Sequence, residues 1–268
     1  MSDTLSSSEI RSRLGVLADS LAVECVARTG STNADLLQRL DCLDSPTLLA
    51  AEEQSAGRGR AGRSWVSPPG ASLAFSLAWP FFRRSLPGLL GLPLAAGVAV
   101  AEALQECGLA VRLKWPNDIL LGEGKLAGIL VETGSVERAG HRVWWAVIGI
   151  GINIALPDGL EQALKRRLAD APMLMGRRNE AMAAITRRLA QMLSRFDVSG
   201  FSAFADQWNA LHAYEGQQVC IFDHGRSLQE GRACGVDEQG RLLLDTASGR
   251  ITVQAGDVSL RPLAASGA

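Results

Sequence analysis

One short stretch of the chain, GRGRAGRSW (57–65), holds residue types suited to chemistry on a charged ligand. Glycine lets backbone N–H groups come close to a ligand, and arginine presents a planar fork of donors that fits carboxylate and phosphate oxygens. Arg58, Arg60 and Arg63 therefore predict a flexible loop that folds around a polyanionic ligand. Trp65 would close over an apolar or planar part of that ligand. The same composition is also typical of a mobile surface loop with its arginines in water, because a short Gly/Arg motif is not specific.

A second group of polar residues lies in KWPNDILLGEGKLAGILVE (114–132). Lys125 is expected where a strand begins after a tight turn, so its ammonium group would be aimed at one place. Asn117 could read a base edge, and Asp118 could bind a metal or anchor a cation. An ion pair between Lys114 and Asp118 that only stabilises the turn is an equal alternative. GEGK is not a Walker phosphate loop, because its first glycine is misplaced and a leucine stands where Ser or Thr should follow the lysine.

The segment IGIGIN (148–153) has a partial likeness to a dinucleotide fingerprint. It lacks the third glycine and leads to no helix, so the Rossmann interpretation is rejected. The glycines are instead expected to let a ligand approach a strand end, with Asn153 as a polar contact. Trp144 and Trp145, earlier in the same stretch, are expected to be core residues.

The elements around these motifs must hold them in place. Residues 47–52 and 72–79 have strand patterns, so the arginine loop would join two strands. Thr32 and Asp35 have capping-box spacing and predict the start of a helix. A helix is also expected over about 89–106, packed against a sheet, since its apolar run is broken too early by prolines, glycines and a glutamate to span a membrane.

The middle of the chain predicts strands followed by helices. Strands are expected over 111–115, 118–132 (as a hairpin) and 143–153, and helices over about 179–196 and 201–212. The polar stretch 158–180 is expected to be a mobile connector. After residue 214, four short strands separated by Gly, Asp and Ser turns are typical of a small all-β barrel. We therefore predict a main domain over residues 1–213 and a small β domain over 214–268.

Composition limits the classes of function. The 268 residues carry a formal net charge of −1, which argues against a general nucleic-acid binder but is compatible with a phosphate-bearing small molecule. Five cysteines without a CxxC motif suit a reducing cytosol and give no zinc pattern. Three histidines form no HExxH motif, and the N-terminal residues lack an apolar targeting region. We expect a cytoplasmic protein with no membrane and no nucleic-acid partner.

Several segments together resemble the biotin–protein ligases, in matching order and approximate spacing. They are GSTNADLL, AEEQSAGRGRAGRSWVSPPGASLAFSL, VRLKWPNDILL, KLAGILVE and GIGIN. The resemblance implies an α+β fold with a mixed β-sheet flanked by helices, as in class II aminoacyl-tRNA synthetases, and a C-terminal SH3-like β-barrel. It also implies an enzyme that activates biotin with ATP and Mg²⁺ as biotinoyl-5′-AMP. The biotin would then pass to a lysine of the biotin carboxyl carrier protein of acetyl-CoA carboxylase.

The resemblance assigns roles to individual residues. It implies biotin contacts from Ser31, Thr32, Asn33, Gln54, Arg58, Gly59, Arg60 and Lys125. It implies ATP or adenylate contacts from Arg60, Arg63, Trp65, Asn117, Asp118, Asn153 and Arg261. Lys125, Arg60 and Arg58 would be the catalytic residues, and no side chain is expected to bind a metal directly.

Two other functions are weighed against this one. A lipoate or octanoate ligase would use a related fold with another acyl group, and the STN and GRGRxGR segments favour biotin. A non-catalytic module that holds RNA or a protein would show salt-sensitive binding and no ATP consumption. Only 29 residues precede Gly30, fewer than the roughly 40 that a self-supporting domain needs. We therefore expect a monofunctional ligase without a DNA-binding domain, either a monomer or a homodimer.

Overall fold

The computed structural model describes residues 3–66, 68–164, 166–223, 226–256 and 258–263. At its centre is a seven-stranded sheet with the order β1-β2-β3-β7-β6-β5-β4. β1 and β2 pair in parallel, whereas all other neighbours are antiparallel, so the sheet is mixed. The strands are β1 (Ala22–Thr29), β2 (Thr47–Gln54), β3 (Ser72–Phe81), β4 (Val111–Lys114), β5 (Asp118–Leu121), β6 (Gly124–Arg138) and β7 (His141–Asn153).

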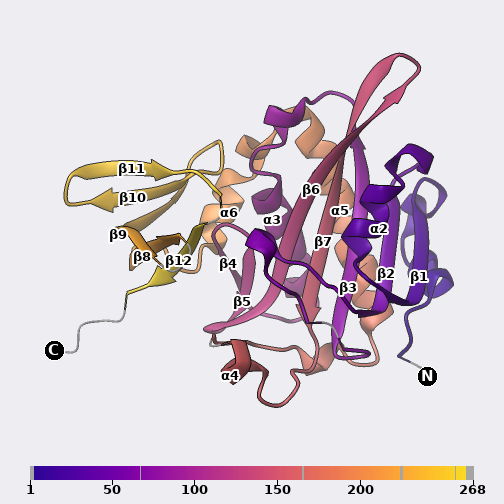
Figure 1. Ribbon diagram of the computed structural model, residues 1–268, viewed down its shortest axis with the longest axis horizontal. Coiled ribbons are helices and arrows are strands. Elements are labelled where there is room, and N and C mark those ends of the chain that lie inside the picture. The colour runs from indigo at the N-terminus through magenta and orange to yellow at the C-terminus, as the bar shows by residue number, and fades with distance from the viewer. Residues whose placement is uncertain (1–2, 67, 165, 224–225, 257, 264–268) are drawn as a thin grey trace.

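Helices cover both faces of this sheet (Figure 1). α3 (Leu92–Glu106), α5 (Arg178–Ser199) and α1 (Ser7–Ser12) pack together on one face, and α2 (Thr32–Gln38) covers part of the other. α4 (Leu160–Leu164) follows β7, and α6 (Ala205–Leu211) leads to the C-terminal strands. Short 3-10 helices lie at Gly15–Asp19, Leu40–Cys42, Arg60–Gly62, Leu86–Leu89, Pro172–Leu174 and Phe201–Phe204.

The side chains of β7 show why one face of the sheet is hollow. Alternate residues of a strand point to opposite faces. The residues in the main core beneath α3 and α5 are Ile148, Ile150 and Ile152. The residues in the smaller core beneath α2 are Val143, Trp145 and Val147. Gly149 and Gly151 continue the α2 face, but they have no side chain to fill it, so the end of β7 leaves space there.

The apolar stretch Leu86–Glu106 is long and apolar enough to span a membrane by length and composition, and it is the one such helical stretch within the described residues. Its α3 part is buried against α5, β4 and β6, which is the packing of a core helix. The helix begins at Leu92 rather than near residue 89, because Gly91 at φ 80° separates it from the preceding 3-10 turn.

The C-terminal strands form an antiparallel sheet with the order β11-β10-β9-β8-β12. Their bounds are β8 (Gln218–Asp223), β9 (Arg226–Val236), β10 (Leu242–Thr246), β11 (Gly249–Val253) and β12 (Val258–Pro262). β12 was not expected from the sequence. The sheet lies beside α6 and β4 (Figure 1) and is joined to the main sheet by the Trp115 indole, which donates to the Gly240 carbonyl at 3.1 Å. The predicted α+β class, a mixed sheet flanked by helices with a small C-terminal β module, is confirmed.

Two local predictions are wrong in detail. Ser31, not Thr32, caps α2, with its hydroxyl accepting from the Ala34 N–H at 3.5 Å. The carboxylate of Asp35 accepts a bond from the Thr29 hydroxyl instead of completing a capping box. The hydroxyl of Thr32 does not cap the helix. It donates a hydrogen bond to Gln54 and lies within hydrogen-bond distance of the Ser76 hydroxyl.

Candidate active site

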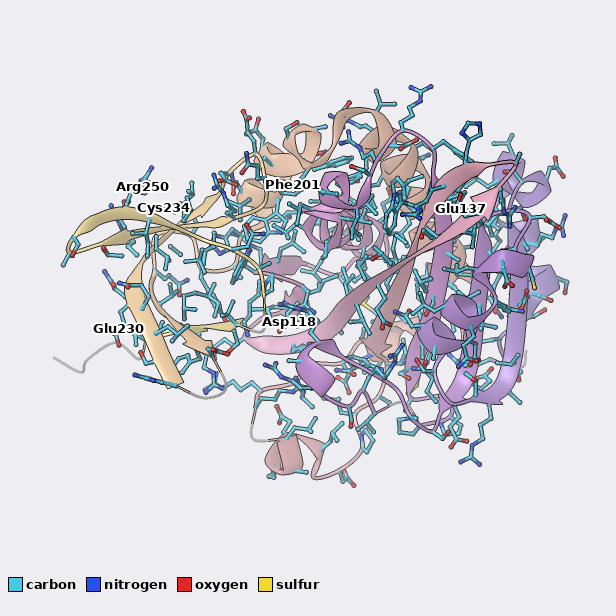
Figure 2. The ribbon with its side chains drawn as sticks, turned by 45° about the horizontal axis from the view of Figure 1, so that its top comes forward. Asp118, Glu137, Phe201, Glu230, Cys234 and Arg250 are labelled. Carbon is cyan, nitrogen blue, oxygen red and sulfur yellow. The ribbon has the colours of Figure 1, made fainter. Side chains whose placement is uncertain are left out.

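A cavity of about 1350 Å³ occupies the hollow face of the sheet and reaches the C-terminal module. The residues before the C-terminal module that were expected to bind ligand and that line the cavity are Ser31, Thr32, Asn33, Gln54, Arg58, Gly59, Arg60, Arg63, Trp65, Asn117, Asp118 and Lys125. Arg261 lines it from β12. Figure 2 shows Asp118 at the end of the main sheet that faces the C-terminal strands. Side chains far apart in the sequence are thus brought around one space.

The floor of the cavity is made of glycines on neighbouring strands. Gly128 of β6 lies directly opposite Gly151 of β7. A Cβ atom at Gly151 would overlap the Trp65 indole, and one at Gly149 would overlap the Asn33 amide. A Cβ atom at Gly128 would lie 3.0 Å from the Lys125 Nζ. Close approach of Asn33 and Trp65 therefore accounts for the glycines at 149 and 151, and Gly128 leaves room for the Lys125 side chain; none of the three has a positive φ.

One end of the cavity is lined by neutral hydrogen-bonding groups. The Gln54 Oε1 accepts from the backbone N–H and the hydroxyl of Thr32, at 2.8 and 3.1 Å. The Ser76 hydroxyl lies 2.7 Å from the Thr32 hydroxyl and donates to the Asn33 Oδ1 at 2.5 Å. Thr32 and Asn33 are buried. This network fixes the side chains before any ligand arrives and suits an uncharged polar ring system.

The glycine–arginine loop is folded as a tight turn rather than left extended. The Gly59 N–H donates to the Arg63 carbonyl at 2.6 Å, and the Trp65 N–H donates to the Gly57 carbonyl at 2.8 Å. Between them, Ala61 and Gly62 have φ values of 54° and 67°. Such left-handed conformations are uncommon for alanine. The turn thus brings Trp65 back toward the sheet.

Two arginines tie this loop to other parts of the cavity wall. Arg58 Nη2 donates to Glu132 Oε2 of β6 at 2.7 Å, and the same oxygen accepts from the Asn33 amide at 2.9 Å. Arg60 Nη1 donates to Asn117 Oδ1 at 3.0 Å, and its Nη2 donates to the Gly256 carbonyl of the C-terminal module. Arg60 therefore connects three segments around the cavity.

The opposite end of the cavity carries a cluster of charges. The Lys125 ammonium donates to Asp118 Oδ1, and Lys114 Nζ lies 3.6 Å from Asp118 Oδ2. Burial disfavours the carboxylate, yet the pKa of Asp118 lies below its ordinary value because the two ammonium groups outweigh burial. Burial lowers the pKa of Lys125, and Asp118 opposes that shift. Lys125 Nζ also lies 5.9 Å from the centre of the Trp65 ring.

Two predicted nucleotide-side residues occupy different environments. Arg261 lines the cavity and places its guanidinium carbon 4.8 Å from the centre of the Phe222 ring. Asn153 is buried and does not line the cavity. Its amide donates to the carbonyls of Lys125 and Ala169 at 3.2 and 3.0 Å. Asn153 therefore supports the strand that carries Lys125.

Sequence reasoning missed two charged residues at this site. Glu132 holds Arg58 and Asn33, and its even spacing from Gly128 on a strand could have placed it on the cavity face. Arg166 lines the cavity from the stretch 158–180, which was interpreted as a mobile connector. In the structure, the middle of that stretch is hydrogen-bonded to Lys125 through the backbone of Arg167 and Ala169. No sequence motif marks it, because the contact depends on the chain returning to the sheet.

Comparisons with known proteins agree with this arrangement. A family model described as "Biotin/lipoate A/B protein ligase family" matches residues 24–153, and one described as "Biotin protein ligase C terminal domain" matches residues 216–261. The bifunctional ligase/repressor BirA of Escherichia coli K12 is 36% identical over 236 residues, which are 86% of this chain and 71% of that protein. The biotin--[acetyl-CoA-carboxylase] ligase of Paracoccus denitrificans is 34% identical over 246 residues, covering 87% of this chain and 98% of that one.

A solved structure of the biotin protein ligase from Aquifex aeolicus, in complex with biotin and ATP, superposes with a TM-score of 0.74 at 28% identity. The match covers 90% of this chain and 99% of that one. The fold and these relatives define the chain as a ligase. It belongs to the biotin protein ligase family.

Proposed function

We propose that this enzyme joins the biotin carboxylate to the α-phosphate of ATP and then transfers biotin to a lysine of the biotin carboxyl carrier protein of acetyl-CoA carboxylase. The observation that carries the proposal is one cavity with two unlike ends. The neutral network of Thr32, Asn33 and Gln54 suits the uncharged ring system of biotin. The cationic end around Lys125 suits a carboxylate and a phosphate that must meet.

The first step brings two anions together. Two unit charges at ~4 Å repel by about 4 kcal/mol at an effective dielectric of about 20. Arg58, Arg60, Arg63 and Lys125 supply positive charge along the cavity wall and offset this repulsion. The carboxylate oxygen attacks the α-phosphorus, and pyrophosphate leaves. The nucleophile is already ionised at neutral pH, so this step needs no general base.

A magnesium ion would be carried mainly by the nucleotide. Among the described residues no group of three or more His, Cys, Asp or Glu side chains is placed to hold a metal. Asp118 is the carboxylate nearest the cationic end, and it is engaged by two lysines. Mg²⁺ usually keeps several waters and binds one or two carboxylates together with substrate phosphates. Because both oxygens of Asp118 are engaged by lysines, the ion would be held through the nucleotide phosphates, whose charge it would neutralise.

The product of the first step is a mixed anhydride that water hydrolyses. The loop 57–65 would retain it, because Arg60 bridges the loop to Asn117 and to the C-terminal module above the cavity. In the second step the carrier lysine amine attacks the acyl carbon. The bond to the phosphate oxygen breaks, AMP leaves, and the amine loses a proton.

The five cysteines are all free thiols, which supports a place in the reducing cytoplasm.

Transfer of labelled biotin to a carrier domain tests this function. The protein is incubated with radiolabelled biotin, ATP, Mg²⁺ and the carrier domain, with a carrier whose target lysine is replaced by arginine as the control. We expect label on the wild-type carrier only, dependent on ATP and not displaced by excess lipoate. Transfer of lipoate instead would identify a lipoate ligase. Salt-sensitive RNA binding without ATP consumption would identify a binding module.

A further inference from the structure

The segment after α4 runs alongside the strand that carries Lys125. The Lys125 N–H donates to the Arg167 carbonyl at 3.1 Å, and the Ala169 N–H donates to the Lys125 carbonyl at 3.0 Å. The amide of Asn153 bonds to the carbonyls of both Lys125 and Ala169. A Cβ atom at Gly124 would overlap the Leu168 carbonyl, so glycine at this position permits the close approach. The segment is therefore fixed at the cavity edge.

This placement brings the guanidinium of Arg166 into the cavity. Arg166 is half-buried and lines the cavity wall. Its Nε is buried and has no hydrogen-bond partner within the part of the chain that the structure describes. Burial lowers the pKa of Arg166, the carboxylate of Asp118 opposes that shift, and the charge of Arg63 adds to it. A buried arginine nitrogen without a partner is costly unless a ligand satisfies it.

The charge balance around Asp118 points to an anionic ligand. Lys125 and Lys114 already share its two oxygens, and Arg166 is a third cation whose charge interacts with the same carboxylate. Arg63 lies near enough to repel Arg166. The local excess of positive charge is relieved when a polyphosphate enters the cavity.

We propose that Arg166 binds the phosphates of the nucleotide directly and is a further substrate-binding residue, contributed by a segment that no sequence motif marks. The inference rests on the proposed function, because it takes ATP as the ligand of this cavity. Among the described residues the buried Nε of Arg166 has no partner, and the phosphate oxygens supply one when ATP binds. Arg166 thus belongs with Arg58, Arg60, Arg63 and Lys125 among the cations of the site.

Calorimetric titrations of Arg166 variants test the proposal. Wild type, Arg166→Ala, Arg166→Gln and Arg166→Lys are titrated with a non-hydrolysable ATP analogue, with adenosine and with biotin. We expect Arg166→Ala to weaken binding of the ATP analogue at least about tenfold, since charge-assisted hydrogen bonds are lost. Binding of adenosine and biotin should stay within about twofold, because neither carries phosphate, and lysine should restore part of the loss. Arg177→Ala is the matched control, since that arginine is exposed, pairs with Glu180 and does not line the cavity.

Two results would overturn the proposal. One is an Arg166→Ala protein that binds the ATP analogue as tightly as wild type. The other is an equal loss of binding for the ATP analogue, adenosine and biotin, which indicates that Arg166 only shapes the cavity. If Arg166→Ala does not fold, Arg166→Gln decides, because glutamine removes the charge and keeps most of the length. A wild-type protein that binds neither biotin nor ATP would refute the proposed function itself. If the wild type binds both ligands and the Arg166 variants give either of the two results above, only the proposal for Arg166 is refuted.

Discussion

The indole ring of Trp65 lies on Gly151 at the floor of the cavity, and a Cβ atom on that glycine would overlap the ring. The last residue of the glycine–arginine loop is therefore held inside the cavity by a strand position that has no side chain. The same ring lies near Lys125, at 5.9 Å from its Nζ to the ring centre. The glycine–arginine loop, the glycine floor and Lys125 therefore lie together around the Trp65 ring.

Gly151→Ala should displace Trp65 from the floor. The backbone at residue 151 has no positive φ, so alanine fits the strand and the fold should persist. Loss of an aromatic stacking surface typically costs about 1–3 kcal/mol per base, so we expect ATP affinity to fall at least about fivefold. Gly88→Ala is the control, because its Cβ would make an ordinary contact with Arg84 at 3.4 Å outside the cavity. Unchanged ATP affinity in Gly151→Ala would show that the position of Trp65 does not matter for the nucleotide.

Arg60→Ala should let the acyl-adenylate escape. Its guanidinium joins the loop to Asn117 and to the Gly256 carbonyl, so its loss opens the cover of the cavity. We expect the half-life of bound biotinoyl-AMP to shorten several-fold and more free intermediate to appear in solution, measured by rapid filtration with labelled ATP. If the variant holds the intermediate as long as wild type does, the loop is not the cover.

Lys125→Ala should impair adenylation far more than docking of the carrier. Lys125 lies beside Asp118 at the cationic end of the cavity, and only 15% of its side chain is exposed. Removal of a charged donor from a reacting centre commonly costs about 100-fold or more in rate, and we expect that loss in pyrophosphate release. Carrier affinity, measured separately, should stay within about twofold. Equal losses in both measurements would count against the role of Lys125 in the first step.

His212 should make the stability of the protein depend on pH. Its side chain is fully buried at the junction with the C-terminal module, with Nδ1 3.2 Å from Glu215 and the Nε2 buried without a partner among the described residues. Burial lowers the pKa of His212 below 6.5, against the opposing effect of Glu215. Below pH 6.5 the unfolded chain therefore takes up a proton that the folded chain resists, so stability falls with a slope of at most about 1.4 kcal/mol per pH unit.

The matched variant is His212→Asn, which keeps a donor near the position of Nδ1 and cannot titrate. Chemical unfolding at pH 7 and pH 5 should show a smaller loss of stability in this variant than in wild type. Equal losses would mean that another group controls the acid sensitivity.

Much of this architecture follows from local sequence rules. A short apolar run marked the strand before the arginine loop, a period-two pattern marked the strand after it, and the turn before Lys125 fixed where that lysine begins its strand. The predicted capping box of Thr32 and Asp35 is wrong, because Ser31, one residue earlier, is the residue that caps the helix. β12 was missed because its alternation is short and its hydrogen bonds come from β8, about forty residues before it.

The parts of the site that sequence could not reveal depend on contacts between distant segments. Asn153 was expected to touch the nucleotide, but its amide is used by the carbonyls of Lys125 and Ala169. Arg166 enters the cavity only because a connector returns to β6 beside Gly124. Glu132 joins Arg58 to Asn33 across a separation of 74 residues from Arg58. None of these pairings has a signature in local composition.

The most direct test of the central claim is isotope exchange between pyrophosphate and ATP without any carrier. The cationic end of the cavity should let the biotin carboxylate meet the α-phosphate, and this claim is open to a direct measurement. It predicts that labelled pyrophosphate enters ATP only when biotin is present and that Lys125→Ala reduces the exchange by about two orders of magnitude. Exchange that proceeds without biotin, or that Lys125→Ala leaves intact, would contradict it.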